Sequence, residues 1–406
     1  MCSAQLSRTS CDHKKIIFNY CAFSIMNNRM ANKLISVVSL IILIYIISVS
    51  AEESSSQWIE KGRDFYNASQ YDDAIDCYEE AIALEPENEV AWFDNGLALQ
   101  KEGRYDDAIN AFNKAIEIDP QDADSWVGKG SVLNDQGKYD EAIQCYDRAI
   151  EIDPQDALAW SNKGIALDDQ SKYDEAIQAC DKAIELDSQN NYAWINKGLA
   201  LYRQGKYDEA IQCYDRAIEI DPQYALAWSN KGVALDDQGK YDEAIQCYDH
   251  VIEIDPQDTD SWNLKLNIIA GRKGKIGDAL TLCNKALEMN PESSTLLDYK
   301  GEILYCLGDY EEALTYYNKA LEIELDPTVF YDKGLVLKKL KHNDESAIAL
   351  SKANELGFEP GNYLNICPCG ERISSTNCDS SAASSGLISS TLEENETHKS
   401  MISSTS

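Results

Sequence analysis

The amino-acid sequence predicts an all-α fold in which short helix hairpins stack one after another. The segment YDEAIQCYDRAIEIDPQ begins at Tyr139 and again, letter for letter, at Tyr207, and a close copy begins at Tyr241. The separations of these starts, 68 and 34 residues, are multiples of 34. Within each 34-residue repeat, apolar residues recur at helical spacing in both halves. Glycine and proline separate the halves and the repeats, as expected for helix boundaries.

The 34-residue register runs from about Ser55 to Pro360 and gives about nine repeats. Tryptophan stands at the fourth place of the first seven repeats, and glycine stands at the eighth place of most of them. Alanine recurs at places 20 and 27, and proline at place 32. The expected repeats are residues 55–88, 89–122, 123–156, 157–190, 191–224, 225–258, 259–293, 294–326 and 327–360, with one extra residue near Arg272 to Lys275.

Each repeat is expected to form two helices joined by a polar turn. The turn carries a glycine such as Gly137, and an aspartate such as Asp140 follows it at a position that suits a helix N-terminus. We expect Gly164 on the first helix to face the small Ala176 on the second, so that the two backbones pack closely. A single hairpin leaves one apolar side bare, so stacking on the next copy predicts a solenoid.

The recurring tryptophan, glycine, alanine and proline pattern resembles the tetratricopeptide repeat, over about three quarters of the chain. The resemblance implies a right-handed α-solenoid, a superhelix of antiparallel helix pairs. It also implies that the first helices line a concave groove, which in this family holds an extended peptide or a partner helix.

The charge of the chain restricts its partners. The sequence holds 36 basic and 70 acidic residues; the first 51 residues hold 5 and 1, and residues 361–406 hold 2 and 5, which leaves 29 and 64 in residues 52–360, a net charge of −35. Such a surface repels phosphate, so nucleic acid and anionic lipid headgroups are excluded as direct ligands of the repeats. A basic or neutral polypeptide is favoured, and the alternative is that the acidity only keeps a long surface soluble.

The register of the family assigns first-helix places 2, 5, 6, 9, 12 and 13 to the inner face. Place 6 holds Asn162, Asn196 and Asn230 in three consecutive repeats. An amide both donates and accepts, so this row is expected to hold a peptide backbone, similar to the asparagine rows inside some long superhelices of the family. The alternative is that near-identical repeats copied a harmless polar residue.

Other inner places are expected to complete a mixed groove surface. They hold Asp168, Asp236, Tyr192, Tyr202 and Arg203. For the acidic positions the alternative is a solvated helix end. Members of the family that bind chaperone tails use a clamp of lysine and arginine at inner places. In the first six repeats only Arg63, Lys101 and Arg203 resemble such a clamp. Recognition of a free C-terminal carboxylate is therefore not expected.

The 13 cysteines fall into two groups with different expectations. Cys77, Cys145, Cys213 and Cys247 share place 23, where stacked helices stand roughly 8–10 Å apart, too far for disulfides, so they are expected to be small buried residues. Cys367, Cys369 and Cys378 have a spacing similar to the zinc motif of SEC-C proteins. Three thiolates with Asp379 as a fourth ligand can hold zinc; the alternatives are a decayed motif or free thiols. No other cofactor is expected.

The two ends of the chain differ from the repeats. Residues 1–29 are interpreted as a leader or an over-extended start, and residues 30–51 as a signal peptide or a signal-anchor transmembrane helix, uncharged from Leu34 to Ala51. The preceding Arg29 and Lys33 predict a cytoplasmic N-terminus with the repeats across the membrane, either anchored or, after cleavage, secreted. Residues 361–406 form a Cys-containing tail rich in serine and threonine, which is expected to be disordered.

No catalytic motif stands out. The four histidines are scattered, and no phosphate-binding glycine loop or nucleophile motif occurs. The sequence therefore predicts a non-enzymatic scaffold for protein–protein interaction on the extracytoplasmic side of a membrane. The alternatives are a regulatory or substrate-recruiting subunit of an enzyme and a zinc-dependent adaptor.

Overall fold

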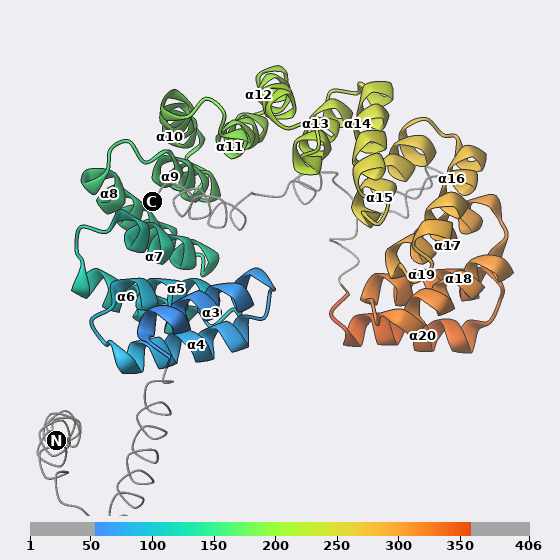
Figure 1. Ribbon diagram of the computed structural model, residues 1–406. Helices are drawn as coiled ribbons and strands as arrows, with labels where there is room; N and C mark the ends of the chain where they lie inside the picture. The colour runs from blue at the N-terminus through green and yellow to red at the C-terminus, as the bar shows by residue number, and fades with distance from the viewer. Residues whose placement is uncertain (1–52, 359–406) are drawn as a thin grey trace, which may run out of the picture. The chain divides into compact units, whose positions relative to one another are not determined.

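The computed structural model describes residues 53–358. In this range the chain forms eighteen α-helices and one π-helical turn, with no strand (Figure 1), which confirms the all-α prediction. None of the helices in residues 53–358 is long and apolar enough to span a bilayer. The hydrophobic segment Leu34 to Ala51, the tail, and the candidate zinc ligands Cys367, Cys369 and Cys378 lie outside the described residues.

The chain divides into two compact parts, Met1–Ala98 and Leu99–Ser406. The first contains α3 (Ser55–Asn67) and α4 (Tyr71–Leu84), and α5 (Glu89–Lys101) begins in it. The second contains α6 (Tyr105–Ile118), α7 (Ala123–Asp135), α8 (Tyr139–Ile152), α9 (Ala157–Asp169), α10 (Tyr173–Leu186), α11 (Asn191–Arg203), α12 (Tyr207–Ile220), α13 (Ala225–Asp237), α14 (Tyr241–Ile254), α15 (Thr259–Asn267), η1 (Ile268–Arg272), α16 (Ile276–Met289), α17 (Ser294–Leu307), α18 (Tyr310–Ile323), α19 (Pro327–Lys339) and α20 (Asn343–Glu355).

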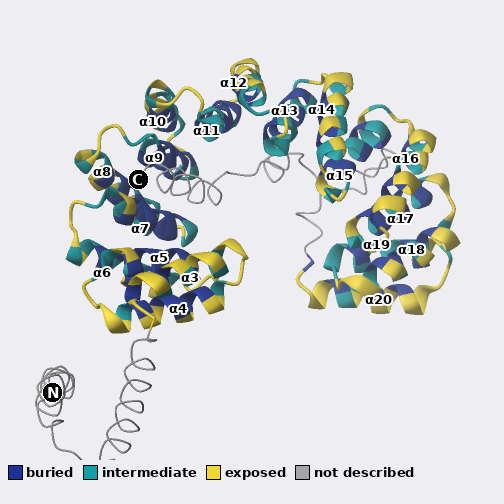
Figure 2. Cartoon of the chain, viewed as in Figure 1, coloured by how far each residue is buried: buried dark blue, intermediate teal, exposed yellow. Residues whose placement is uncertain are grey.

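Within Leu99–Ser406, consecutive helices pack as hairpins. The first helix of a repeat packs on the second, as α9 does on α10, and the second packs on the first helix of the next repeat, as α10 does on α11. Figure 2 shows that first helices such as α7, α9 and α11 are mostly buried, whereas second helices such as α8 and α10 expose one side. The second helices bury a single stripe, which in α10 consists of Ala176, Ala179, Cys180 and Ala183. The predicted stacking of hairpins is therefore present.

The glycine at place 8 packs against an aromatic ring of the second helix. A Cβ atom on Gly198 would lie 2.5 Å from Cε1 of Tyr214. The prediction for Gly164 was wrong in its partner, because a Cβ atom there would meet Sγ of Cys180 at 2.6 Å, closer than any atom of Ala176. Helical side chains lean toward the N-terminus of their own helix, so place 24 covers the surface beside the alanine one turn earlier. The same packing on a ring occurs in Gly62–Tyr78, Gly130–Tyr146, Gly232–Tyr248 and Gly301–Tyr317.

The tryptophan at place 4 is tied to the end of the preceding repeat. Its indole Nε1 donates to the main-chain carbonyl of the residue at place 32, as Trp228 does to Pro222 at 3.1 Å. Where serine replaces proline, Trp194 donates to the Ser188 carbonyl at 3.3 Å. Because the acceptor belongs to the main chain, the bond survives this replacement.

The turn between the two helices requires a left-handed residue. Gly103, Gly137, Gly205 and Gly239 have φ between +72° and +76°, which glycine adopts without a steric cost. In the fourth repeat the position is Ser171, with φ of 61°. The next helix then begins, and Asp140 lies in the first turn of α8 as predicted. Its Oδ1 accepts from Nε2 of Gln170 in the next repeat at 2.8 Å.

The extra residue of the seventh repeat is accommodated by the π-helical turn η1, directly after the shortened α15. The π-helical turn η1 ends at Arg272, where the predicted insertion region, Arg272 to Lys275, begins. The same helix carries Leu266 at place 8 in place of glycine, and Leu266 is fully buried. A π-helical turn absorbs one added residue without ending the helix.

Candidate functional site

The three predicted asparagines lie on neighbouring first helices. Asn162 belongs to α9, Asn196 to α11 and Asn230 to α13, and α11 packs against both α9 and α13. They are 7%, 2% and 0% exposed, respectively. The structure therefore brings the asparagine row together, with its amides largely enclosed.

The asparagines differ in their hydrogen bonds. Asn196 Nδ2 donates to Oγ of Ser161 in the preceding repeat at 3.3 Å. Asn230 has no hydrogen-bond partner for either Oδ1 or Nδ2 among the described residues. At the place equivalent to Ser161, the repeat preceding Asn230 has the buried Ile195, which offers no acceptor. A buried amide without partners costs about 1–3 kcal/mol. A ligand that paired with Asn230 would remove this cost, and because the side chain is 0% exposed, its neighbours must move to admit one.

From the second repeat to the seventh, residues at or next to places 12 and 13 pair between successive repeats, and we call these pairs the inter-repeat ladder. At each of these five junctions a donor or cation stands opposite an aspartate, 35 residues along the chain or 36 across the extra residue. The pairs are Gln100 Nε2 to Asp135 Oδ2 (2.7 Å), Asn134 Nδ2 to Asp169 Oδ2 (3.5 Å), Arg203 Nη1 to Asp168 Oδ2 (2.6 Å), the Tyr202 hydroxyl to Asp237 Oδ2, and Arg272 Nε with Asp236 Oδ1 (3.7 Å).

The ladder includes four of the predicted groove residues, Asp168, Asp236, Tyr202 and Arg203, each with a partner inside the protein. The alternative of a solvated helix end is wrong for Asp168, which is buried. Sequence reasoning assigned these side chains to a ligand surface because it compared positions 34 residues apart. The complementary residues lie one position further along, which is the signal that could have revealed the pairs.

Burial governs the charge of these carboxyl groups. It raises the pKa of Asp168 to about 7, although the Arg203 guanidinium lowers it, and the neighbouring Asp169 raises it further. Burial also raises the pKa of Asp236, which Arg272 opposes and Asp237 reinforces. At neutral pH, Asp168 therefore exchanges readily between its charged and neutral forms.

Tyr192, the remaining predicted groove residue, lies at the start of α11 and is half-buried. Its ring packs edge-to-face on that of Tyr224, with ring centroids 5.4 Å apart. This pair joins one first helix to the residue that precedes the next, α13. Tyr192 thus lies toward the opposite end of α11 from Tyr202 and Arg203.

The cysteines at place 23 are free and buried, as predicted. Burial raises the pKa of the Cys145, Cys213 and Cys247 thiols to about 11. They are therefore protonated at neutral pH and unsuited to nucleophilic or metal-binding roles.

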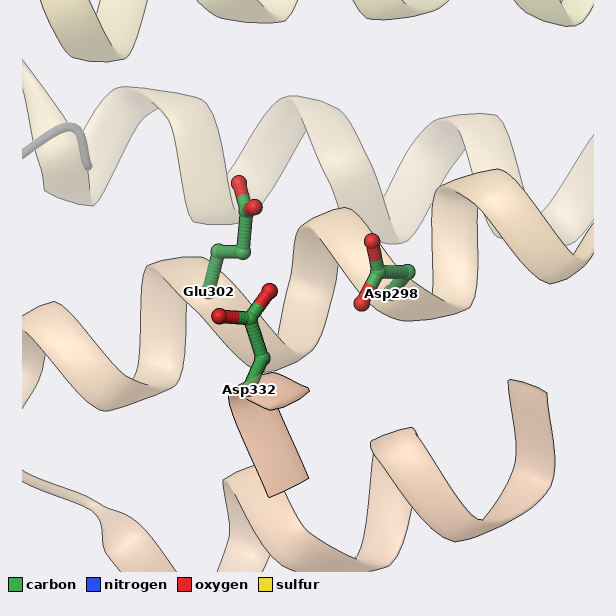
Figure 3. Close-up of side chains that lie close together, drawn as sticks. All are labelled: Asp298, Glu302 and Asp332. Atoms are coloured by element: carbon green, nitrogen blue, oxygen red, sulfur yellow. The ribbon is translucent and has the colours of Figure 1, made fainter. Parts of the chain in front are cut away.

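The structure also gathers three carboxylates that sequence reasoning missed. Asp298 and Glu302 on α17 and Asp332 on α19 lie close together (Figure 3), and one oxygen from each lies within 4.8 Å of the others. In the register these residues occupy places 5, 9 and 6. Asp298 and Glu302 are the only acidic residues at places 5 and 9 in all nine repeats, which is the sequence signal that was available.

Family models of the tetratricopeptide repeat match most of the repeat region. One model matches residues 59–123, 93–157 and 127–191. Further models of the same repeat match residues 179–212, 198–239, 225–258 and 294–326. Together they cover residues 59–258 and 294–326, more than half of the chain.

A curated relative is human tetratricopeptide repeat protein 21B, 34% identical over 88 residues, which span 22% of this chain and only 6% of that protein. Similar solved structures include MamA, at 27% identity and a TM-score of 0.36, covering 40% of this chain and 96% of that one. YrrB, described as having an unusual peptide-binding site, has 23% identity, a TM-score of 0.36, and coverage of 46% and 97%. Pseudomonas aeruginosa PilF has 19% identity, a TM-score of 0.44, and coverage of 52% and 96%.

Proposed function

Because the chain belongs to the tetratricopeptide repeat family, we propose that it is a non-enzymatic scaffold that binds an extended polypeptide along Asn162, Asn196 and Asn230. Proteins built from this repeat serve as scaffolds for protein–protein interaction. The bound segment lies across successive first helices and is held through its main chain.

The observation that carries this proposal is the buried amide of Asn230, whose oxygen and nitrogen both lack a partner among the described residues. A peptide bond offers one donor and one acceptor, which match the two unused atoms of the amide. Asn162 and Asn196 lie at the same place on the neighbouring first helices, so one extended segment would meet an amide at each repeat.

The charge of the repeats sets the chemistry of the partner. Residues 52–360 carry 29 basic and 64 acidic residues. This field speeds the approach of a basic segment and slows that of an acidic one. The partner is accordingly a basic or neutral polypeptide, and its association rate falls as salt is added.

The place of action we propose is the extracytoplasmic side of a membrane. The uncharged segment from Leu34 to Ala51, preceded by Arg29 and Lys33, supports this location. N-terminal sequencing of the mature chain separates an uncleaved anchor from a cleaved signal peptide. Protection of the repeats from protease in intact cells, followed by cleavage only after lysis, would count against the extracytoplasmic location.

The scaffold proposal is tested by affinity capture from detergent-solubilised membranes. We expect the triple substitution of Asn162, Asn196 and Asn230 to alanine to lose the partners that the wild type recovers. The matched control replaces Gln136, Gln170 and Gln204 by alanine, because these amides bridge repeats elsewhere. Equal recovery by the asparagine triple variant and the wild type would rule out the asparagine row. Turnover of a substrate by the purified chain would contradict the scaffold.

A second variant separates loss of binding from loss of folding. Asn230→Leu removes the unpartnered amide and adds apolar surface, and the equivalent place of the next repeat already holds Leu264. We expect a gain of about 1–2 kcal/mol in the free energy of unfolding, together with weaker partner capture. Urea denaturation measures the first effect. A more stable chain that still captures the partner fully would refute the role of Asn230.

A further inference from the structure

The three carboxylates on α17 and α19 lie close together in a partly buried place. Asp332 is 4% exposed, and Oδ1 of Asp298 is closed off from solvent and accepts no hydrogen bond within residues 53–358. Lys300, between Asp298 and Glu302 in sequence, instead donates to the Tyr316 hydroxyl at 2.7 Å.

One equivalent contact, in the first compact part, places a cation beside the same aspartate position. There, the residue at place 9 is Arg63 and the residue at place 6 of the following repeat is Asp94. Arg63 Nε donates to Asp94 Oδ2 at 2.7 Å, and Asp94, like Asp332, is 4% exposed. Between the eighth and ninth repeats the place-9 residue is Glu302, so a carboxylate stands where a guanidinium stands beside Asp94. Asp298 adds a third carboxylate from the preceding turn of α17.

We propose that Asp298, Glu302 and Asp332 bind a divalent cation, which takes the place of the guanidinium that Arg63 supplies elsewhere. The three oxygens come from two first helices packed against each other. The cation therefore joins the eighth repeat to the ninth, and this site is separate from the asparagine row.

The ligand chemistry selects a hard ion. All three donors are carboxylate oxygens, which suit Ca²⁺, Mg²⁺ or Mn²⁺ rather than zinc or copper. Their oxygens all lie within 4.8 Å of one another, so small side-chain movements would bring one oxygen of each onto a single ion. Ca²⁺ accepts about six to eight oxygen ligands in a flexible geometry, whereas Mg²⁺ demands a near-ideal octahedron at about 2.1 Å and keeps several waters. Calcium is accordingly the expected ion, with water completing its coordination.

Calorimetric titration of the chelator-treated full chain with CaCl₂ tests the proposal. We expect one site with a dissociation constant of roughly 10–1,000 µM, with weaker binding of MgCl₂. Asp332→Asn should weaken calcium binding at least tenfold. Glu312→Gln, which removes one exposed charge from α18, should bind as the wild type does. Absence of calcium binding, or equal binding by the Asp332→Asn and Glu312→Gln variants, would overturn the proposal.

Glu302→Arg gives an independent test that does not depend on loss of folding. It recreates the Arg63–Asp94 arrangement beside Asp332, so the chain should melt at a higher temperature than the metal-free wild type. Calcium in excess should raise the melting temperature of the wild type by about 2 °C or more and leave that of Glu302→Arg unchanged. The proposal fails if calcium stabilises both chains equally.

Discussion

Asp168 is buried and lies 2.6 Å from a guanidinium nitrogen of Arg203. The ion pair favours the charged carboxyl, but removal from water disfavours it more strongly, and the balance raises the pKa from its ordinary value of 3.8 to about 7. The folded chain therefore binds more protons than the unfolded chain between about pH 4 and pH 7. Its stability must fall as the pH rises through this window.

We expect Asp168→Asn to remove this part of the pH dependence, because an amide does not titrate. Between about pH 5 and pH 8, the urea midpoint of the wild type should fall more steeply than that of Asp168→Asn. Glu175→Gln, at an exposed position of α10, controls for the loss of one negative charge. Parallel pH profiles for the wild type and Asp168→Asn would show that burial does not govern this carboxyl.

Single residues also mark how far the candidate site could be predicted. The positions of Asn162, Asn196 and Asn230 followed from the register. Their different hydrogen-bond partners did not follow from the register. The residue at place 5 before Asn230 is Ile195 rather than a serine, and only the packing of the helices shows that the amide of Asn230 is enclosed. The cluster of Asp298, Glu302 and Asp332 was not predicted, because no sequence motif joins acidic residues from two repeats.

At the scale of helices and turns, the sequence predicted most helix boundaries, because each boundary has a local cause. Glycines at the turns have positive φ and the helices end before them. The partner of Gly164 could not be predicted, because the direction in which side chains lean decides which residue covers it. The π-helical turn was visible only as an added residue, since spacing does not reveal how a helix absorbs it.

The turn of the fourth repeat provides a test at this scale. Ser171 adopts φ of 61° at a turn that carries glycine in most repeats and Ser69 or Lys341 in the first and ninth. A left-handed residue with a Cβ atom costs about 1–2 kcal/mol. Glycine loses more entropy on folding, so we expect Ser171→Gly to raise the free energy of unfolding by about 0.5–1 kcal/mol. Gly205→Ser, at the same turn of the next repeat, should have the opposite effect in the same urea titration. A change of the same sign in both variants would contradict this account of the turn.

Across the second compact part, near-identical repeats could pair with several neighbours, and the inter-repeat ladder distinguishes among them. Asp168 faces Arg203, and Tyr202 faces Asp237. If Asp168 met Asp237 of the sixth repeat in place of Arg203, two carboxylates would come together inside the protein. This matching supplies the specificity that the repeated 17-residue segment lacks.

A charge exchange tests this role. Asp168→Arg alone sets two guanidinium groups together, and Arg203→Asp alone sets several carboxylates together, so each should cost about 3–5 kcal/mol of unfolding free energy. The double variant restores an opposite pair and should recover about 1–3 kcal/mol relative to the sum of the single effects. Thermal and urea unfolding of all four chains give the coupling. A double variant no better than that sum would show that the pair carries no specificity.

The alternation of the ladder limits how such an array can be lengthened. One additional copy of residues 225–258 would set Asp236 opposite a second Asp237, and the junction would hold two acids. Residues 191–258 copied together would set Asp236 opposite a second Arg203 and keep every junction complementary. In this part of the chain the ladder therefore favours growth by pairs of hairpins, and the doublet of 68 residues is also the distance that separates the starts of the two identical segments.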